Sequence, residues 1–124
     1  MKKKILIIDD EEAFTKLVKL NLERTEKYQV KTEKQGSRGL AAVKRFKPDL
    51  ILLDVLMPEV GGGTVFAQIK EDESLKDIPV VFLTAAARKE EVSSRGGAIG
   101  GHPFIAKPVS KKKLIACIEQ NIRS

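Results

Sequence analysis

The chain has 124 residues, of which 42% are hydrophobic and 32% are charged, a size and composition typical of one globular domain. No apolar run approaches the roughly 18 residues of a membrane-spanning helix, which argues against membrane insertion. The net charge of +6 comes from basic residues scattered over separate segments, with few aromatic residues between them. This distribution favours a solvated surface over direct binding of nucleic acid. We expect a single domain over residues 1–124.

The single cysteine, Cys117, cannot form an intrachain disulfide, which fits a reducing compartment. Its neighbours Leu114, Ile118 and Ile122 recur at helical spacing, so Cys117 is predicted to be a small core residue rather than a reactive thiol. The basic start of the chain is followed by an apolar run over residues 5–8 only, too short for a secretory signal peptide. We therefore expect a cytoplasmic protein.

Strand and helix patterns alternate along the first half of the chain. They predict a buried strand over 4–9, a helix over 11–26, a half-exposed strand over 28–33 and a helix over 37–46 that ends before Pro48. Asp10 is the expected cap of the first helix. Phe14, Leu17, Val18 and Asn21 are expected on one face of that helix.

The second half continues the same alternation. Residues 50–54 form an apolar run ending in Asp54, which predicts a strand buried on both faces. The remaining elements are a helix over 64–73, a strand over 78–83, a short helix over 88–95, a strand over 104–106 and a last helix that Ser110 caps and that ends almost at Ser124. Each strand is thus followed by a helix.

The apolar content of the strands predicts their order in the sheet. The runs at 5–8, 50–53 and 80–83 are continuously apolar and should be central, whereas the strands at 28–33 and 104–106 should be edges. Right-handed crossovers with helices on both faces then favour the order 2-1-3-4-5. The predicted fold is α/β, a flavodoxin-like (βα)5 doubly wound parallel sheet.

In this order the carboxyl ends of the first and third strands meet where such sheets bind ligands, which brings Asp9, Asp10 and Asp54 together. Two carboxylates ~4 Å apart repel by about 4 kcal/mol at an effective dielectric constant of 20, so the cluster calls for a cation. Oxygen ligands of this kind suit Mg²⁺. Lys107 and Thr84, at the ends of other strands, add a positive charge and a hydroxyl. Such a site can bind a phosphoryl group, and in-line attack by a carboxylate would form an aspartyl phosphate.

The ordered set of Asp9-Asp10, Asp54 followed by Met57-Pro58, Thr84-Ala85 and Lys107-Pro108 resembles the receiver domain of two-component response regulators, including those of chemotaxis. The resemblance covers essentially the whole chain, which identifies residues 1–124 as a single receiver domain. Receiver domains themselves have the strand order 2-1-3-4-5, so the topology and the resemblance are not independent.

The resemblance implies a role for each of these residues. Asp54 would accept a phosphoryl group from a phosphohistidine on a sensor histidine kinase or a phosphotransfer protein. Mg²⁺ would be the cofactor, bound by Asp10 directly, by Asp9 through water, by Asp54 and by the backbone carbonyl of Leu56. Lys107 would pair with Asp54 and then with the phosphoryl oxygens.

The resemblance also implies how the signal leaves the site. Thr84 would move to hydrogen-bond the phosphoryl group and let Phe104 rotate inward. This would remodel the surface formed by helix 88–95, strand 104–106 and the last helix, where a downstream protein target would bind. The implied protein is a signalling switch, a monomer or weak phosphorylation-dependent dimer. It would phosphorylate and dephosphorylate itself at Asp54 with Mg²⁺, without being a turnover enzyme.

Four positions depart from the family pattern. Gly61 stands where an acidic residue is common, and Phe104 replaces the commoner tyrosine, so its ring has no hydroxyl. Leu56 and Ala86, two residues beyond the acceptor and the threonine, cannot orient an attacking water. We therefore expect a slowly hydrolysing phosphoaspartate.

Two other functions on the same fold stay open. One is an adaptor that binds partners without phosphorylation. The other is a flavin or nucleotide binder, disfavoured because no loop has a phosphate-binding pattern and the crevice is acidic. Met1 directly before the first strand, and an end close behind the last helix, favour a stand-alone receiver over one excised from a longer regulator.

Overall fold

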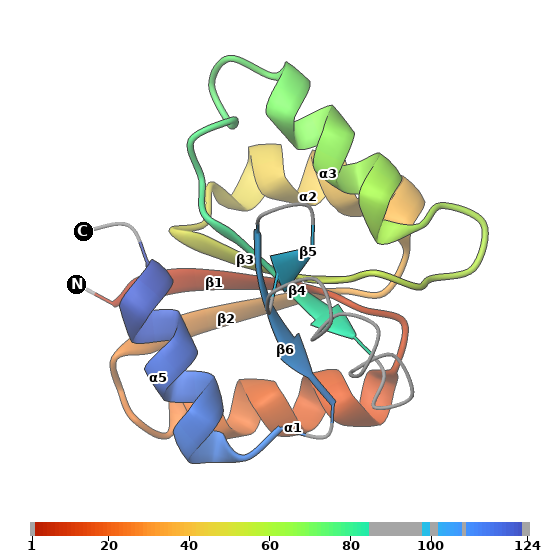
Figure 1. The fold of residues 1–124 in the computed structure, drawn as a ribbon. Helices are drawn as coiled ribbons and strands as arrows, with labels where there is room; N and C mark the ends of the chain where they lie inside the picture. Colours follow the sequence, from red (N-terminus) through yellow and green to blue (C-terminus); the bar gives the residue numbers. More distant parts are fainter. Residues whose placement is uncertain (1, 85–97, 100–101, 108, 123–124) are drawn as a thin grey trace.

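The computed structural model describes residues 2–84, 98–99, 102–107 and 109–122. The elements in chain order are β1 (Lys3–Ile8), α1 (Glu12–Glu23), β2 (Tyr28–Glu33), the 3₁₀ turn η1 (Gly36–Arg38), α2 (Gly39–Phe46), β3 (Leu50–Asp54), α3 (Gly62–Glu71), β4 (Val80–Thr84), β5 (Ala98–Ile99), β6 (His102–Ala106) and α5 (Lys111–Asn121) (Figure 1). Among these described helices, none is long and apolar enough to cross a membrane.

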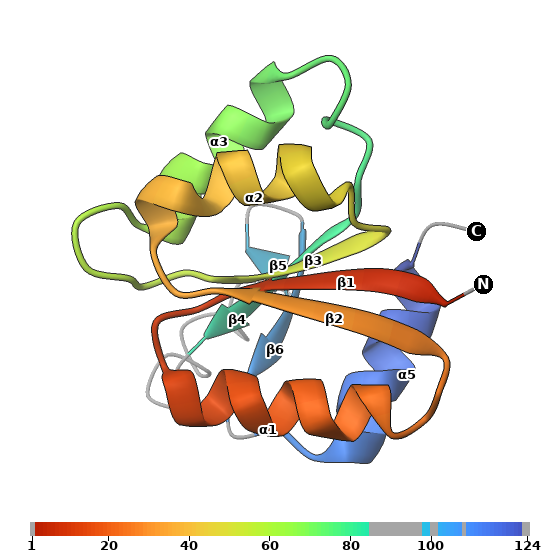
Figure 2. The same cartoon turned by 180° about the vertical axis from the view of Figure 1, so that it is seen from behind.

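The strands form one sheet in the order β2-β1-β3-β4-β6-β5. The pairs from β2 to β6 are all parallel, which confirms the predicted flavodoxin-like order, with β6 as the fifth parallel strand. The short strand β5 pairs antiparallel with β6 and was not predicted. Figures 1 and 2 show α1 and α5 on one face of the sheet and α2 and α3 on the other.

Each face of the sheet carries its own hydrophobic core, because successive side chains of a strand point to opposite faces. In β3, Leu50 and Leu52 join the core beneath α1 and α5, whereas Ile51 and Leu53 join the core beneath α2 and α3. This is why the run is apolar at every position. Cys117 packs against the first core, as predicted, and burial raises the pKa of its thiol.

Several helix boundaries differ from those predicted. The N-cap of α1 is Glu11, so the prediction that Asp10 caps this helix is wrong. Helix α3 begins at Gly62, two residues earlier than predicted and inside a run of three glycines at 61–63. The cap of α5 is confirmed, since the Ser110 hydroxyl accepts a hydrogen bond from the Lys113 N–H at 3.2 Å. The predicted helix 88–95 lies outside the described residues.

The buried face of α1 is centred on Thr15, Val18 and Leu22. Leu17, predicted to share one face with Phe14 and Val18, is 57% exposed and does not lie against the core with them, so that prediction is wrong. At about 100° per residue, Leu17 lies well away from the centre of this face. Phe14, as predicted, packs against the core.

Gly62 and Gly63 are neighbours at the start of α3, but only the first is tightly packed. A Cβ atom on Gly62 would lie 2.1 Å from the Asp54 carbonyl oxygen, whereas a Cβ on Gly63 meets nothing within 4 Å. We expect Gly62→Ala to lower the free energy of unfolding by about 2 kcal/mol or more, because β3 or α3 must shift. The matched variant Gly63→Ala should raise it by about 0.5–1 kcal/mol through helix propensity. Urea unfolding of both proteins checks this, and effects of equal sign would contradict it.

Candidate functional site

Three carboxylates meet at the carboxyl end of the sheet. Asp9 follows β1 and Asp54 ends β3, and these strands are neighbours with Ile8 opposite Leu53. One oxygen each from Asp9, Asp10 and Asp54 lies within 4.8 Å of the others. Asp9 is 0% exposed and Asp54 4%, whereas Asp10 faces solvent. The three acids singled out in the sequence are therefore brought together, two of them inside the protein.

Lys107 supplies the positive charge of the cluster. Its Nζ atom lies 2.6 Å from Asp9 Oδ2, 2.7 Å from Glu11 Oε1 and 3.7 Å from Asp54 Oδ2. The Lys107 N–H donates to the Thr84 carbonyl at 2.7 Å, which fixes the residue beside the end of β4. The ammonium thus lies nearer to Asp9 and Glu11 than to Asp54.

Glu11 is the site residue that sequence reasoning missed. It lies at the start of the helix predicted over 11–26, where an acid is favourable for the first turn and calls for no further role. In the structure its side chain reaches across to a lysine 96 positions away. No local pattern predicts such a contact, because it depends on how β6 sits beside the start of α1.

The charges of the cluster shift the ionisation of Asp54. Burial, and then the neighbouring charge of Asp9, raise the pKa of Asp54 from 3.8 to about 7. The Lys107 charge and the hydrogen bond from the Leu56 N–H lower the pKa of Asp54 but only partly offset this, and a hydrogen bond with Asp10 adds to the rise. The three carboxylates therefore carry more negative charge than one lysine can balance.

Lys107 itself stays charged. Burial lowers the pKa of its ammonium, but the close contacts with the Asp9 and Glu11 carboxylates and the charges of Asp9 and Asp54 outweigh this, so that the pKa of Lys107 lies above its ordinary value of 10.5. The Phe14 ring covers another side of this ammonium, with the ring centre 4.8 Å from Nζ. Lys107 is therefore a fixed positive charge at neutral pH.

The carboxylates fit a hard divalent cation. Asp9 Oδ2 is fully buried and accepts no regular hydrogen bond within the described part of the chain, and its charge is compensated by the Lys107 ammonium beside it. A donor set of carboxylate oxygens alone favours Mg²⁺ or Ca²⁺ over softer metals. Asp9, Asp10 and Asp54 are thus the residues that would hold such an ion.

The loop after β3 lies against the Asp54 carboxylate. The Leu56 N–H donates to Asp54 Oδ1 at 3.3 Å, and the Leu56 side chain is 52% exposed. A cavity of about 260 Å³ adjoins this loop and reaches Asp10; it is lined by Asp10, Lys34, Gln35, Gly36, Ser37, Pro58 and Glu59. The solvent side of the carboxylate cluster is therefore open at Asp10.

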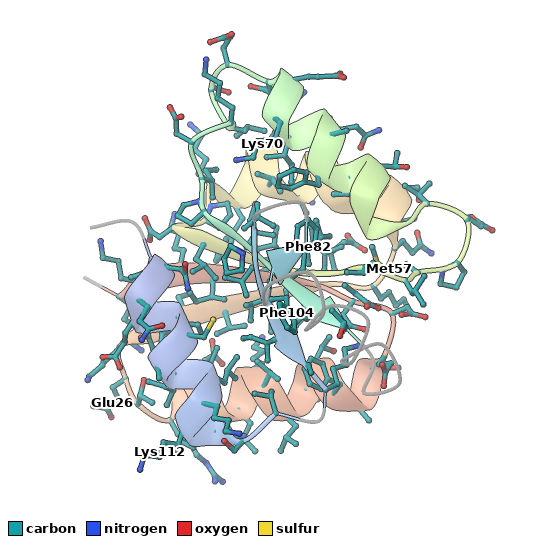
Figure 3. All side chains as sticks on the ribbon, viewed as in Figure 1. Glu26, Met57, Lys70, Phe82, Phe104 and Lys112 are labelled. Atoms are coloured by element: carbon teal, nitrogen blue, oxygen red, sulfur yellow. The ribbon has the colours of Figure 1, made fainter. Side chains whose placement is uncertain are left out.

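Thr84 and Phe104 lie on the neighbouring strands β4 and β6. Thr84 ends β4 and is buried, and it lies opposite Ala106. Phe104 lies opposite Phe82 and packs, half-buried, against the core beneath α2 and α3 (Figure 3). The segment 85–97, which would complete the predicted signalling surface, is outside the described residues. The switch roles of Thr84 and Phe104 stay predictions.

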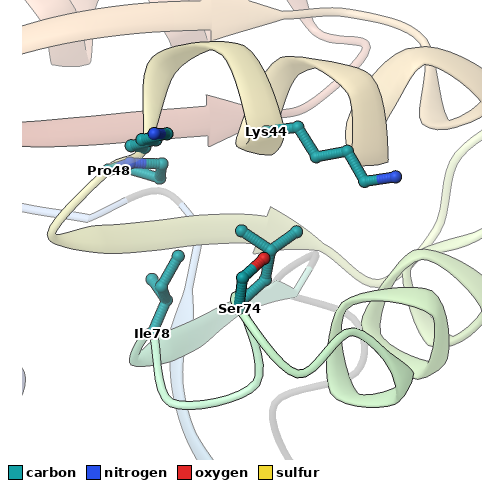
Figure 4. Close-up of a pocket in the computed structure, with 6 residues that line it drawn as sticks. Lys44, Pro48, Ser74 and Ile78 are labelled. Carbon is teal, nitrogen blue, oxygen red and sulfur yellow. The ribbon is translucent and has the colours of Figure 1, made fainter.

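A second cavity is separate from this site. It measures about 330 Å³ and is lined by Lys44, Lys47, Pro48, Ser74, Leu75 and Ile78 (Figure 4). Pro48 lies just before β3 and Ile78 just before β4, so this cavity is at the amino end of the sheet. The carboxylates are at the opposite end and contribute nothing to it.

Comparisons with known proteins agree with the geometry. The sequence pattern of the response regulator receiver domain matches residues 5–119. The polar-differentiation response regulator DivK of Brucella ovis is 36% identical over 121 residues, covering 96% of this chain and 95% of DivK. The DNA-binding dual master transcriptional regulator RpaA of Synechocystis sp. is 36% identical over 120 residues, covering 97% of this chain and 49% of RpaA. The chain therefore spans about half the length of RpaA.

A solved structure supports the fold. The chemotaxis protein CheY4 of Vibrio cholerae matches with a TM-score of 0.82 at 24% identity, covering 97% of this chain and 98% of that one. At this identity the likeness concerns the architecture alone. The match to the receiver pattern and the identity to DivK carry the assignment further: the chain belongs to the family of response regulator receiver domains, which take part in phosphorylation-based two-component signalling.

Proposed function

We propose that the chain is a phosphorylation-activated switch that accepts a phosphoryl group on Asp54 from a histidine kinase or a phosphotransfer protein. The observation that carries the proposal is the buried Asp54 carboxylate at the end of β3, with the Lys107 ammonium 3.7 Å away and two further carboxylates beside it. A nucleophile, a fixed positive charge and ligands for a hard cation are the parts that phosphoryl transfer requires.

Three groups of the chain contribute to the phosphoryl transfer: the Asp54 carboxylate, the Leu56 N–H and the Lys107 ammonium. An ionised Asp54 oxygen attacks phosphorus, the bond from phosphorus to the donor breaks, and the donor leaves with the electron pair. The Leu56 N–H holds Asp54 Oδ1 and so fixes the carboxylate. Lys107 compensates the negative charge on the phosphoryl oxygens. Mg²⁺, held by Asp9, Asp10, Asp54 and the Leu56 carbonyl, would supply the positive charge that lets an anionic donor approach.

The output would follow from movement of Thr84 towards the phosphoryl group. Thr84 ends the strand next to Asp54, since Asp54 and Leu83 are partners in the sheet. Its movement would free room for Phe104 on β6 and alter the surface around β6 and α5, where a target protein would bind. We place this switch in the cytoplasm, as a monomer or a weak phosphorylation-dependent dimer that does not act as a turnover enzyme.

The phosphoryl group should be lost slowly, because the exposed apolar side chain of Leu56 cannot orient a water molecule. We expect Leu56→Asn to speed the loss about fivefold, the effect of one added hydrogen bond of about 1 kcal/mol in the transition state. Leu56→Met, which adds no hydrogen-bonding group, should leave the rate unchanged. Decay of the labelled protein in Mg²⁺ buffer measures this, and a decay slower in Leu56→Asn than in the unaltered chain would contradict it.

The proposal is tested by incubating the protein with acetyl phosphate and Mg²⁺ and measuring its intact mass. We expect one phosphoryl adduct that is absent when EDTA removes the metal and absent in Asp54→Asn. Asp77→Asn, the same change at an exposed position, should still form the adduct. If no adduct forms under any of these conditions, an adaptor that binds partners without phosphorylation becomes the better interpretation.

A further inference from the structure

Glu11 occupies the N-cap position of α1 without acting as a cap. Its backbone is extended, with φ −82° and ψ 95°, and its side chain accepts no hydrogen bond from the helix. Residues at this position usually satisfy the free N–H groups of the first turn with a side-chain oxygen. Glu11 instead directs Oε1 to Lys107 Nζ at 2.7 Å. The Glu11 carboxylate therefore binds Lys107 and does not cap the helix.

The backbone of Glu11 is fixed by the site itself. The Glu11 N–H donates to Asp9 Oδ1 at 2.9 Å, while the other oxygen of Asp9 lies 2.6 Å from Lys107 Nζ. Asp9 thus contacts both residues of the Glu11–Lys107 ion pair, with one carboxylate oxygen on the Glu11 backbone and the other beside the Lys107 ammonium. This arrangement fixes the Glu11 backbone beside Lys107, from where the Glu11 carboxylate contacts the ammonium.

Two carboxylates, those of Asp9 and Glu11, are in close contact with the Lys107 ammonium. Only Glu11 can be released from it at a small cost in free energy. Asp9 is fully buried, so its charge depends on the lysine, whereas the Glu11 side chain is 60% exposed and can be hydrated when released. The ammonium lies 2.7 Å from Glu11 but 3.7 Å from Asp54. The contact of Nζ with Glu11 is thus about 1 Å shorter than its contact with Asp54, and a phosphoryl group on Asp54 would offer the ammonium a second anionic partner.

We propose that Glu11 is a positioning residue that holds Lys107 in the unphosphorylated protein and competes with the incoming phosphoryl group for it. This inference rests on the proposed function of Asp54. The phosphoryl group brings additional negative charge beside Asp9, Asp10 and Glu11, so Lys107 exchanges the Glu11 carboxylate for a phosphoryl oxygen and Glu11 turns to solvent. Glu11 thereby sets how readily the site accepts a phosphoryl group without touching that group.

Three variants separate the contact from the charge. Glu11→Gln removes the charge, and Glu11→Asp keeps the charge but shortens the side chain by one C–C bond, about 1.5 Å, so that it no longer reaches Lys107. Glu12→Gln removes the same charge one residue further on, where the carboxylate is exposed and pairs with Lys16 at 3.4 Å. Glu12 is thus a matched control for the electrostatic effect of losing one acid near the start of α1.

The experiment measures the initial rate of phosphorylation by acetyl phosphate at saturating Mg²⁺, over a range of acetyl phosphate concentrations. In the reaction an Asp54 oxygen bonds to phosphorus, the bond from phosphorus to the bridging oxygen breaks, and acetate leaves with the electron pair. Because a half-exposed ion pair is weak, we expect Glu11→Gln and Glu11→Asp to raise the rate at low acetyl phosphate by about twofold to fivefold. Glu12→Gln should leave it unchanged.

A second readout follows the lysine directly. The ¹⁵Nζ resonance of Lys107, assigned by its loss in Lys107→Arg, should shift in both Glu11 variants and stay in place in Glu12→Gln. Damage to the fold would slow phosphorylation. An increase in rate together with this shift therefore supports competition between Glu11 and the phosphoryl group for Lys107. Rates in the Glu11 variants equal to or below that of the unaltered chain, or an equal increase in Glu12→Gln, would overturn the inference alone. No adduct in the unaltered chain would overturn the proposed function and this inference with it.

Discussion

Lys107→Met is expected to lower the free energy of unfolding by about 3–5 kcal/mol at pH 7.5 in EDTA. Lys107 is 8% exposed and is the cation beside the fully buried Asp9. Removing one partner of a buried ion pair leaves the other charge uncompensated, and here Asp54 lies close by and adds repulsion. Urea unfolding of the variant and of the unaltered chain measures the difference.

The pH dependence of this loss identifies its cause. The pKa of Lys107 is raised, so the stability that its charge contributes is complete below its ordinary value of 10.5 and is lost only at still higher pH. Between pH 8 and 5 any change must therefore come from Asp54, whose pKa is raised to about 7. As Asp54 takes up a proton, the penalty in Lys107→Met should shrink. Lys112→Met, the same change at an exposed position of α5, should alter the free energy of unfolding by no more than about 0.5 kcal/mol at pH 8 or at pH 5. Equal losses in the two variants would contradict the account.

Asp54→Asn is expected to make the metal-free protein more stable, by about 2–4 kcal/mol at pH 8 and about half as much at pH 5. The pKa of Asp54 is raised to about 7 in the folded protein from 3.8. Because the pKa of Asp54 is raised on folding, Asp54 makes its full contribution to the free energy of unfolding below about pH 4. This contribution is lost as the pH rises through about 7. Each pKa unit corresponds to about 1.36 kcal/mol, which sets the upper end of the range. Asparagine cannot ionise and escapes this loss.

Mg²⁺ should reverse the order of the two proteins. An ion that binds the folded site stabilises it, and it does so more in the unaltered chain, where Asp54 supplies a charged oxygen. Unfolding curves at pH 5 and 8, each with EDTA and with Mg²⁺, measure both effects. Asp77→Asn, at an exposed carboxylate, is the control and should change neither. If Asp54→Asn gave no gain in EDTA above pH 7, the pKa of Asp54 would not be raised and the repulsion from Asp9 would be refuted.

The sheet could be predicted because its signal is repeated at every residue. Leu50 to Leu53 alternate between two cores, so each position must be apolar, and three such runs place three strands at the centre. The acids at the strand ends then follow from topology, because parallel strands deliver their carboxyl ends to one edge. Strand β5 could not be predicted, since two residues are too few to show an alternating pattern.

The contacts inside the site were harder to predict than its location. Asp9, Asp54 and Lys107 were placed at one edge from the sequence, but which carboxylate lies nearest to the lysine depends on side-chain reach across β1, β3 and β6. Glu11 escaped notice because an acid at a helix start has a sufficient local explanation. Leu17 was misplaced for a related reason: its spacing from Phe14 fits a helical face, but the centre of the buried face is set by where the sheet lies.

We propose that Asp54 carries the phosphoryl group, and chemical reduction tests this directly. Borohydride reduces an aspartyl phosphate to homoserine, which marks the modified position permanently. After incubation with acetyl phosphate and Mg²⁺, reduction and peptide mass spectrometry, we predict homoserine at position 54 and none at positions 9 and 10. Homoserine at Asp9 or Asp10 with unmodified Asp54, or an adduct that borohydride does not reduce, would contradict the account.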